Sequence, residues 1–294
     1  MKATIQLCTY NRRALLERVL DACFEQTVDG DAYEVVLVND GSTDDTRALV
    51  ERMRPLAPCK FVAIDRPNGG LAKARNTGIA AATGERIIFI DDDVLPLPNF
   101  VEEHLRSGTR YPSNIVRGGA INVESFDDLP PPVWSIRNYS GNYFWTTNVS
   151  VPLETLRNVG GFDETFAEYG WEDIDVGLRL RAARVRATFN RRALVYHYKP
   201  PLRGASLDAM QRQARAQART ALELVRLHPH WRAYLATGNY AAARALHGAI
   251  ARSGVAAHCR AVLADVKPEA VLSKHQERAA RRLATEAYFE ELGK

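Results

Sequence analysis

Residues 86–93 read Arg86-Ile87-Ile88-Phe89-Ile90-Asp91-Asp92-Asp93, an apolar run that ends in three adjacent carboxylates. A short, isoleucine-rich run of this kind is typical of a strand buried on both faces of a parallel sheet. Three neighbouring carboxylates repel one another unless a cation lies near them. A lone triplet would read as a solvated turn or a helix cap. After a buried strand, a hard divalent ion bridging carboxylate and phosphate oxygens is the expected partner.

Three more strands are expected before this run, and each is followed by a helix signal. The strands are predicted at Ala3–Cys8, Glu34–Val38 and Lys60–Ile64. The helices are predicted after Asn11, at Thr43–Arg54 and at Leu71–Ala82. Ser42 and Asp45 have the spacing of a capping box for the second helix. Repeated strand–helix units predict an α/β fold with a mostly parallel, doubly wound sheet flanked by helices.

Polar clusters follow the predicted strands. They are Thr9-Tyr10-Asn11, Asn39-Asp40-Gly41-Ser42, Asn68-Gly69-Gly70 and Asp91-Asp92-Asp93. Open α/β sheets bind ligands beyond the carboxyl ends of their strands, so we expect these clusters to converge at one edge. Neither a dinucleotide-binding Gly motif nor a phosphate-binding P-loop is present, which disfavours both of those sites.

The remaining chain divides by composition. Residues 111–200 are rich in aromatics, Gly and Pro, with a loop expected at Pro130-Pro131-Pro132, a helix at Glu172–Ala183 and a strand at Ala193–Tyr198. Beyond Pro200-Pro201 the chain is rich in Ala, Arg and Gln, and helices are predicted at Leu207–Leu227 and Tyr240–Ala251. We therefore expect three regions, 1–110, 111–200 and a C-terminal α-helical extension at 201–294.

Composition bounds the class of protein. The chain has 294 residues, 46% of them hydrophobic and 25% charged, which excludes collagen-like and wholly disordered chains. The formal charge of +4 is too mild to indicate nucleic-acid binding. Residues 1–200 carry −3 and residues 201–294 carry +7, so the basic character belongs to the last third. The four scattered cysteines fit reduced thiols in the cytoplasm, and neither a signal peptide nor a membrane span is expected.

Two further positions are candidates for chemistry. Trp171-Glu172-Asp173 opens a predicted helix, where acidic residues also serve as ordinary caps. A general base beside an aromatic that stacks on a sugar is the functional alternative. His197 closes a predicted strand, and it is either a structural histidine or a third ligand of an Asp-bound metal.

Together these motifs resemble family 2 glycosyltransferases of GT-A fold. The resemblance rests on residues 9–12, 38–44, 68–78 and 89–93. Residues 148–150, 160–164 and 169–180, which include Trp171-Glu172-Asp173, are similar to the C-terminal half of galactosyltransferase-like members. The likeness covers about residues 1–200, and we find no resemblance for the last ninety or so. It implies a Rossmann-like, nucleotide-sugar-binding half at 1–110 and an acceptor-binding, catalytic half at 111–200.

The resemblance also implies roles for individual residues. Asp173 matches the catalytic base, and Glu172 binds acceptor or orients the site. Asp91, Asp93 and His197 match ligands of Mn²⁺ or Mg²⁺. The nucleotide-sugar site is expected to comprise Thr9, Tyr10, Arg12, Asp40, Gly41, Asn68, Gly69, Lys73, Arg75, Asp91 and Asp92. Candidates for stacking on the acceptor sugar are Trp171, Tyr169 and Trp145.

The implied reaction is an inverting transfer from a nucleotide-diphosphate sugar, with UDP as the expected nucleotide, to an acceptor hydroxyl in glycan or glycoconjugate biosynthesis. The unbroken Asp triplet departs from relatives that have a small residue within it. The Gln-x-x-Arg-Trp motif of processive synthases is absent, which favours single addition. The alternatives are a catalytically silent sugar-nucleotide-binding scaffold and a nucleotidyltransferase that makes sugar nucleotides.

Three interpretations remain open for the basic extension, residues 201–294. It is a helical element packed on the catalytic domain or used for self-association, a peripheral membrane surface at the cytoplasmic face, or a site for an acidic acceptor or partner.

Overall fold

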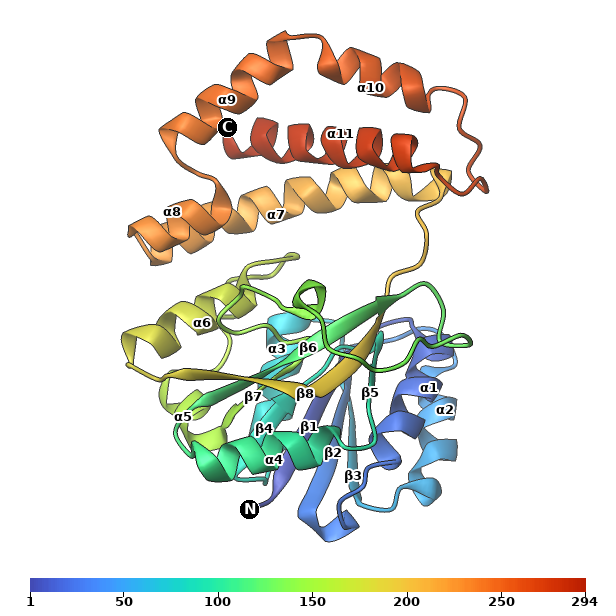
Figure 1. Cartoon of the computed structure of the whole chain (residues 1–294), viewed down its shortest axis with the longest axis vertical. Helices are drawn as coiled ribbons and strands as arrows, with labels where there is room; N and C mark the ends of the chain where they lie inside the picture. The colour runs from blue at the N-terminus through green and yellow to red at the C-terminus, as the bar shows by residue number, and fades with distance from the viewer. The chain divides into compact units, whose positions relative to one another are not determined.

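The computed structural model describes residues 1–294, which form two compact units. The first unit comprises Met1–Ala167 and Glu172–Lys199. The second comprises Glu168–Trp171 and Pro200–Lys294. The first unit is mixed α/β and the second is helical (Figure 1).

The first unit is built on one eight-stranded sheet in the order β3-β2-β1-β4-β7-β6-β8-β5. The strands are β1 (Ala3–Thr9), β2 (Tyr33–Asn39), β3 (Lys60–Asp65), β4 (Arg86–Phe89), β5 (Val94–Pro96), β6 (Ile115–Val123), β7 (Val149–Pro152) and β8 (Ala187–Tyr198). The pairs among β1 to β4 are parallel, whereas β7 runs antiparallel to β4. The expected mostly parallel half is therefore confirmed. The pairing changes from parallel to antiparallel at β4, the strand that precedes the Asp triplet.

Helices cover both faces of this sheet. They are α1 (Arg13–Phe24), α2 (Thr46–Met53), α3 (Leu71–Ala81), α4 (Phe100–Arg110), α5 (Leu153–Asn158) and α6 (Glu172–Ala182). Ile88 belongs to one buried apolar cluster with α1 and α2, and Ile87 and Phe89 belong to another with α3 and α6. Alternate residues of β4 point to opposite faces, so β4 is buried on both sides, as its sequence predicts.

The predicted capping box at Ser42 and Asp45 is wrong. The Ser42 hydroxyl accepts a hydrogen bond from the Asn11 backbone N–H, and Asp45 makes no side-chain cap. The Asp44 carboxylate instead accepts from the backbone N–H and hydroxyl of Thr46, so α2 begins at Thr46 rather than Thr43. The competing local contact from the loop after β1 explains the difference.

Strands β5, β6 and β7 were not predicted, and β8 begins six residues before the predicted Ala193. Glycine weakens the strand signal of β6 at Gly118 and Gly119. A Cβ on Gly118 would lie 2.0 Å from the carbonyl oxygen of Ala193, so the close approach of β6 to β8 requires glycine there. The glycines that permit the pairing of β6 with β8 therefore also weaken the strand pattern in the sequence.

The second unit consists of helices α7 (Leu207–Leu227), α8 (Trp231–Thr237), α9 (Ala241–Arg252), α10 (Val255–Leu263) and α11 (Lys274–Leu292). Helices α7 and α11 lie side by side, with Ala218 and Ala221 packed against Leu292 (Figure 1). Arg219 bridges Glu168 at 2.6 Å and Glu291 at 3.1 Å within this unit. No helix of the chain pairs the length with the apolar composition that crossing a bilayer demands.

Candidate active site

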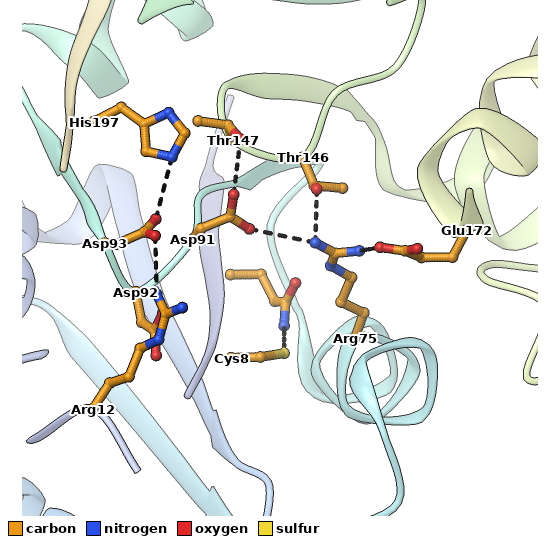
Figure 2. Close-up of polar contacts among 11 residues, drawn as sticks. Cys8, Arg12, Arg75, Asp91, Asp92, Asp93, Thr146, Thr147, Glu172 and His197 are labelled. Atoms are coloured by element: carbon orange, nitrogen blue, oxygen red, sulfur yellow. Dashed lines mark hydrogen bonds and ion pairs between the residues drawn. The ribbon is translucent and has the colours of Figure 1, made fainter. Parts of the chain in front are cut away.

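The polar clusters that follow β1 and β4 meet at the carboxyl edge of the sheet. The Thr9 hydroxyl at the end of β1 donates a 2.8 Å hydrogen bond to Asp92. Arg12 extends from the start of α1 and donates to Asp92 at 3.1 Å and to Asp93 at 2.9 Å (Figure 2). Burial raises the pKa of Asp92 to about 6, although Arg12 and Thr9 oppose that shift. Arg12 thus neutralises part of the repulsion within the Asp triplet.

Asp93 faces His197 across the pairing of β5 with β8. Val94 is the register partner of His197, and this places the imidazole Nε2 3.5 Å from Asp93 Oδ1. Burial opposes ionisation of Asp93, but His197 and Arg12 outweigh it and lower the Asp93 pKa to about 2. Oδ1 is buried and accepts no hydrogen bond. An unsatisfied carboxylate oxygen opposite an imidazole nitrogen is a donor pair that suits a divalent cation.

Asp91 points to the other side of the triplet, toward β7. One of its oxygens accepts a 2.8 Å hydrogen bond from the Thr147 hydroxyl, and the other accepts from Arg75 at 3.3 Å. Carboxylate oxygens have further lone pairs, so these contacts leave Asp91 able to ligate a cation. The chain contains no preassembled cluster of three metal-ligating side chains. Asp91, Asp93 and His197 therefore do not form a closed donor set.

Arg75 joins the Asp triplet to the beginning of α6. Its guanidinium donates to Glu172 at 2.7 Å, to Thr146 at 2.7 Å and to Asp91 (Figure 2). Its side chain is 5% exposed and its guanidinium lies 5.1 Å from the centre of the Phe162 ring. The sequence predicts that Arg75 contacts the nucleotide. In the structure its guanidinium instead donates to two carboxylates and one hydroxyl.

Asp173 lies one residue after Glu172 in the first turn of α6. Its side chain is half-buried, and this burial, together with the charge of Glu172, raises its pKa to about 7 despite the opposing charge of Arg75. An aspartate with a pKa near neutrality is suited to accept a proton during a reaction. The predicted base is therefore placed in an environment that favours proton exchange.

Asp40 holds the loop between β3 and α3. Its carboxylate accepts hydrogen bonds from the backbone N–H groups of Gly69 and Gly70 and an ion pair from Arg66 at 2.9 Å. The Asn68 side chain donates to the Asp40 carbonyl at 2.9 Å. Gly41 adopts a φ of 80°, which favours glycine, and a Cβ there would lie 2.5 Å from the Asn68 nitrogen. Asp40, Gly41, Asn68 and Gly69 are thus brought together as one loop anchor.

The other predicted residues are less constrained. Tyr10 is half-exposed and Lys73 is exposed. Trp145 lies beside the metal candidates, with its ring centre 6.1 Å from that of His197. Tyr169 and Trp171 belong to the helical unit, where the Trp171 indole N–H donates to the Gln217 carbonyl at 2.8 Å.

Sequence reasoning missed Arg66, Thr146 and Thr147. Arg66 follows β3 directly, and a basic residue there was an available signal. Thr146 and Thr147 precede β7, and their role depends on the pairing of β7 with β4. Because β7 carries no strand pattern in the sequence, these hydroxyls could not be placed beside Asp91 from sequence alone.

Comparison with known proteins identifies relatives of the whole first unit. Residues 4–162 match glycosyl transferase family 2, and residues 134–199 match the N-terminal domain of galactosyltransferase. A validoxylamine A glucosyltransferase of Streptomyces hygroscopicus subsp. limoneus is 30% identical over 224 residues, which cover 64% of this chain and 49% of that protein. The chain thus spans about half the length of such curated relatives.

Solved structures share the fold at lower identity. The mannosyltransferase PcManGT from Pyrobaculum calidifontis, in complex with GDP-Man and Mn²⁺, has a TM-score of 0.64 at 21% identity, covering 99% of this chain and 86% of its own. Staphylococcus aureus TarS 1–349 has a TM-score of 0.58 at 19% identity, covering 100% of this chain and 90% of its own. The fold is therefore the GT-A fold of these glycosyltransferases. Since the family match covers more than half of the residues, the chain belongs to glycosyl transferase family 2.

Proposed function

We propose that this chain transfers a sugar from a nucleotide-diphosphate sugar to an acceptor hydroxyl, with inversion at the anomeric carbon. The observation that carries the proposal is the Arg75 bridge between Asp91 and Glu172. It joins the carboxylates suited to a diphosphate-bound cation to the helix start that presents Asp173. Direct transfer requires a group that stabilises the leaving diphosphate and a base that accepts the proton of the acceptor hydroxyl.

Residues of this chain divide the chemical work. Asp173 takes the proton of the acceptor hydroxyl as the oxygen attacks, a role that contributes about 10²–10⁴-fold to the rate. Glu172 pairs with Arg75 at 2.7 Å and holds the first turn of α6 in place. Attack on the face opposite the leaving diphosphate inverts the anomeric centre, and no enzyme nucleophile is needed.

A divalent cation, Mn²⁺ or Mg²⁺, is the proposed cofactor. When bound it would supply Lewis-acid stabilisation of the charge that develops on the departing diphosphate. Asp91, Asp93 and His197 are the proposed ligands. The unsatisfied Asp93 oxygen opposite His197 supports this set. Thr9, Arg12, the Asp40 loop, Lys73 and Asp92 are proposed to contact the nucleotide sugar, with Trp145 toward the acceptor.

We propose a UDP-sugar as the donor and a single addition to a carbohydrate or glycoconjugate acceptor. Structural neighbours have been solved with UDP-GlcNAc and with GDP-Man, so both nucleotides belong in the test. A silent sugar-nucleotide-binding scaffold and a nucleotidyltransferase are the competing functions. The placement of Asp173 beside Glu172 disfavours both, because neither needs a base for an acceptor hydroxyl.

The test combines binding with turnover. Thermal unfolding is measured with UDP, GDP and dTDP and their sugars, with and without Mn²⁺, because a ligand of the folded state raises the melting temperature by mass action. Released nucleoside diphosphate and the anomeric configuration of the product are then measured by NMR. Asp173→Asn, with exposed Asp265→Asn as its matched control, should retain donor binding and lose transfer. Retained turnover in Asp173→Asn would overturn the proposed base.

Residues 201–294 are proposed to serve as a partner surface in addition to the transfer reaction. A membrane at the cytoplasmic face and a second copy of the chain are the two partner classes considered, and basic charge favours the membrane.

A further inference from the structure

The helical unit contains a long stretch without a single acidic residue. Residues 224–264 have no Asp or Glu, whereas they carry five of the arginines and four of the seven histidines of the chain. This stretch covers the last turn of α7, all of α8 and α9, and α10 (Figure 1). A segment of 41 residues with one sign of charge creates a positive field, which attracts an anionic partner.

Helix α8 presents an apolar face to solvent inside this stretch. Ala233 and Thr237, four residues apart, are buried against the unit. Trp231, Tyr234 and Leu235 share the opposite face at i, i+3 and i+4 and are 61%, 36% and 57% exposed. A single exposed apolar residue is ordinary, but an exposed Trp, Tyr and Leu on one face of a seven-residue helix marks an interaction surface.

Tyr240 follows this helix and directly precedes α9, and it is 40% exposed. No residue of α9 is fully buried. We refer to Trp231, Arg232, Tyr234, Leu235 and Tyr240 together as the α8–α9 surface.

Arg232, the arginine of this surface, has no anionic partner within the chain. Arg226 pairs with Glu223, which directly precedes the acid-free stretch. Arg260 pairs with Glu286 of α11, which lies outside the stretch. Arg232, Arg244 and Arg252 form no ion pair, and the Arg232 guanidinium lies 4.4 Å from the centre of the Trp231 ring. Long cationic side chains beside exposed aromatics can reach lipid head groups while their stems cover apolar surface.

We propose that the α8–α9 surface binds the head-group region of an anionic lipid bilayer. Trp and Tyr favour this region because one end of each side chain is apolar and the other polar. Arginines without internal partners gain attraction from anionic lipids. Association with a second copy through this surface is disfavoured, because two acid-free surfaces of the same sign would repel. The proposal does not depend on the transfer reaction.

Vesicle co-sedimentation of the full chain tests it. The probes are vesicles of phosphatidylcholine alone and vesicles with one quarter phosphatidylglycerol, at low and at high salt. We expect binding to the anionic vesicles, weakened by salt. The double variant Trp231→Ser/Leu235→Ser should bind at least about tenfold more weakly, since both side chains lose apolar burial. Arg232→Gln should weaken binding about fivefold.

Matched controls distinguish binding through this surface from nonspecific binding to vesicles. Val271→Ser removes an apolar side chain that is 52% exposed outside the acid-free stretch, and Arg281→Gln removes an exposed arginine of α11. Both should bind like the parent, and thermal unfolding checks that every variant is folded. Absence of binding to anionic vesicles would overturn the proposal, as would equal losses in the controls. A concentration-dependent dimer abolished by Leu235→Ser, without vesicle binding, would assign the surface to a second copy instead. Retention of RNA without vesicle binding would likewise refute the lipid assignment.

Discussion

The guanidinium of Arg75 on α3 lies 2.7 Å from the carboxylate of Glu172 on α6, and the two residues are 97 positions apart in the chain. The same guanidinium reaches Asp91, so one buried cation balances acidic groups from two separate motifs. Burying carboxylates is costly unless they are paired and hydrogen-bonded. Arg75 therefore makes the close approach of the two acidic motifs possible.

Arg75→Gln should lower the free energy of unfolding by about 3–5 kcal/mol near pH 8, because it leaves buried carboxylates without their cation. Urea unfolding of the variant and the parent at pH 8 measures the difference. Arg47→Gln, which removes an exposed arginine paired with Asp65, is the control and should change stability by at most about 1 kcal/mol. A loss for Arg75→Gln no larger than that of the control would argue against this account.

Asp173 should set the acidic limb of the activity profile. Its pKa of about 7 means that the base is protonated, and unable to accept a proton, in most molecules below that pH. Turnover should thus fall as pH decreases through 7, and Asp173→Asn should lower it about 10²–10⁴-fold above pH 7, with a smaller difference below that pH. Initial rates of nucleoside diphosphate release from pH 5 to 9 check both expectations. Finding the acidic limb near pH 4 would mean that another group acts as base.

The raised pKa of Asp173 also makes a prediction about stability. A carboxyl whose pKa is higher in the folded state than in the unfolded state stabilises folding only while it is protonated in both, and that benefit is lost as pH rises through the folded-state pKa. Asp173→Asn, which cannot ionise, should therefore unfold at a higher temperature than the parent at pH 8, with a smaller gain at pH 4. Calorimetry measures this. A variant less stable than the parent at pH 8 would contradict the raised pKa of Asp173.

Glu34 provides the opposite case, away from the site. Its buried carboxylate accepts from Lys60, Thr4 and Thr83, and although burial opposes ionisation these bonds lower its pKa to about 2. The stability it confers is present above the unfolded-state pKa and is lost as pH falls through about 2. Glu34→Gln should lower the free energy of unfolding by about 2–3 kcal/mol at pH 7, with the difference narrowing below pH 4. Acid unfolding that is identical in the two proteins would exclude this role.

Asp93 and His197 should govern any stabilisation by Mn²⁺ with nucleotide. Asp93→Asn keeps the shape of the side chain but removes the charge, so the rise in melting temperature on adding Mn²⁺ with nucleoside diphosphate should disappear. His197→Gln should reduce it in part. Asp265→Asn, an exposed carboxylate of the helical unit, is the control. A full Mn²⁺ response in Asp93→Asn would remove that residue from the proposed ligand set.

The parallel half of the sheet could be predicted because its strands are continuous apolar runs, each ended by a polar cluster. Arg86–Phe89 and Tyr33–Asn39 carry that signal within a few residues. Gly118 and Gly119 in β6, and the short β5 and β7, carry no comparable pattern, because close packing of neighbouring strands determines them.

Only those residues of the candidate site that lie within recognisable sequence motifs could be predicted. The triplet Asp91 to Asp93 and the pair Glu172–Asp173 were visible as sequence, and the structure adds how they are connected. Thr146 and Thr147 acquire meaning from the pairing of β7 with β4, which is a contact between distant segments. The burial of Arg75 among acidic groups likewise depends on α3 and α6 meeting, and spacing within one motif does not encode it.

The distance along the chain between Arg75 and Glu172 also sets an order of events during synthesis. A ribosome adds about 5–20 residues per second, so Glu172 is made roughly 5–20 s after Arg75. During that interval β1 to β4 can already pair, while the guanidinium destined for the interior still lacks its main carboxylate. The nascent N-terminal half must therefore keep Arg75 hydrated, and its final packing is postponed until α6 has been made.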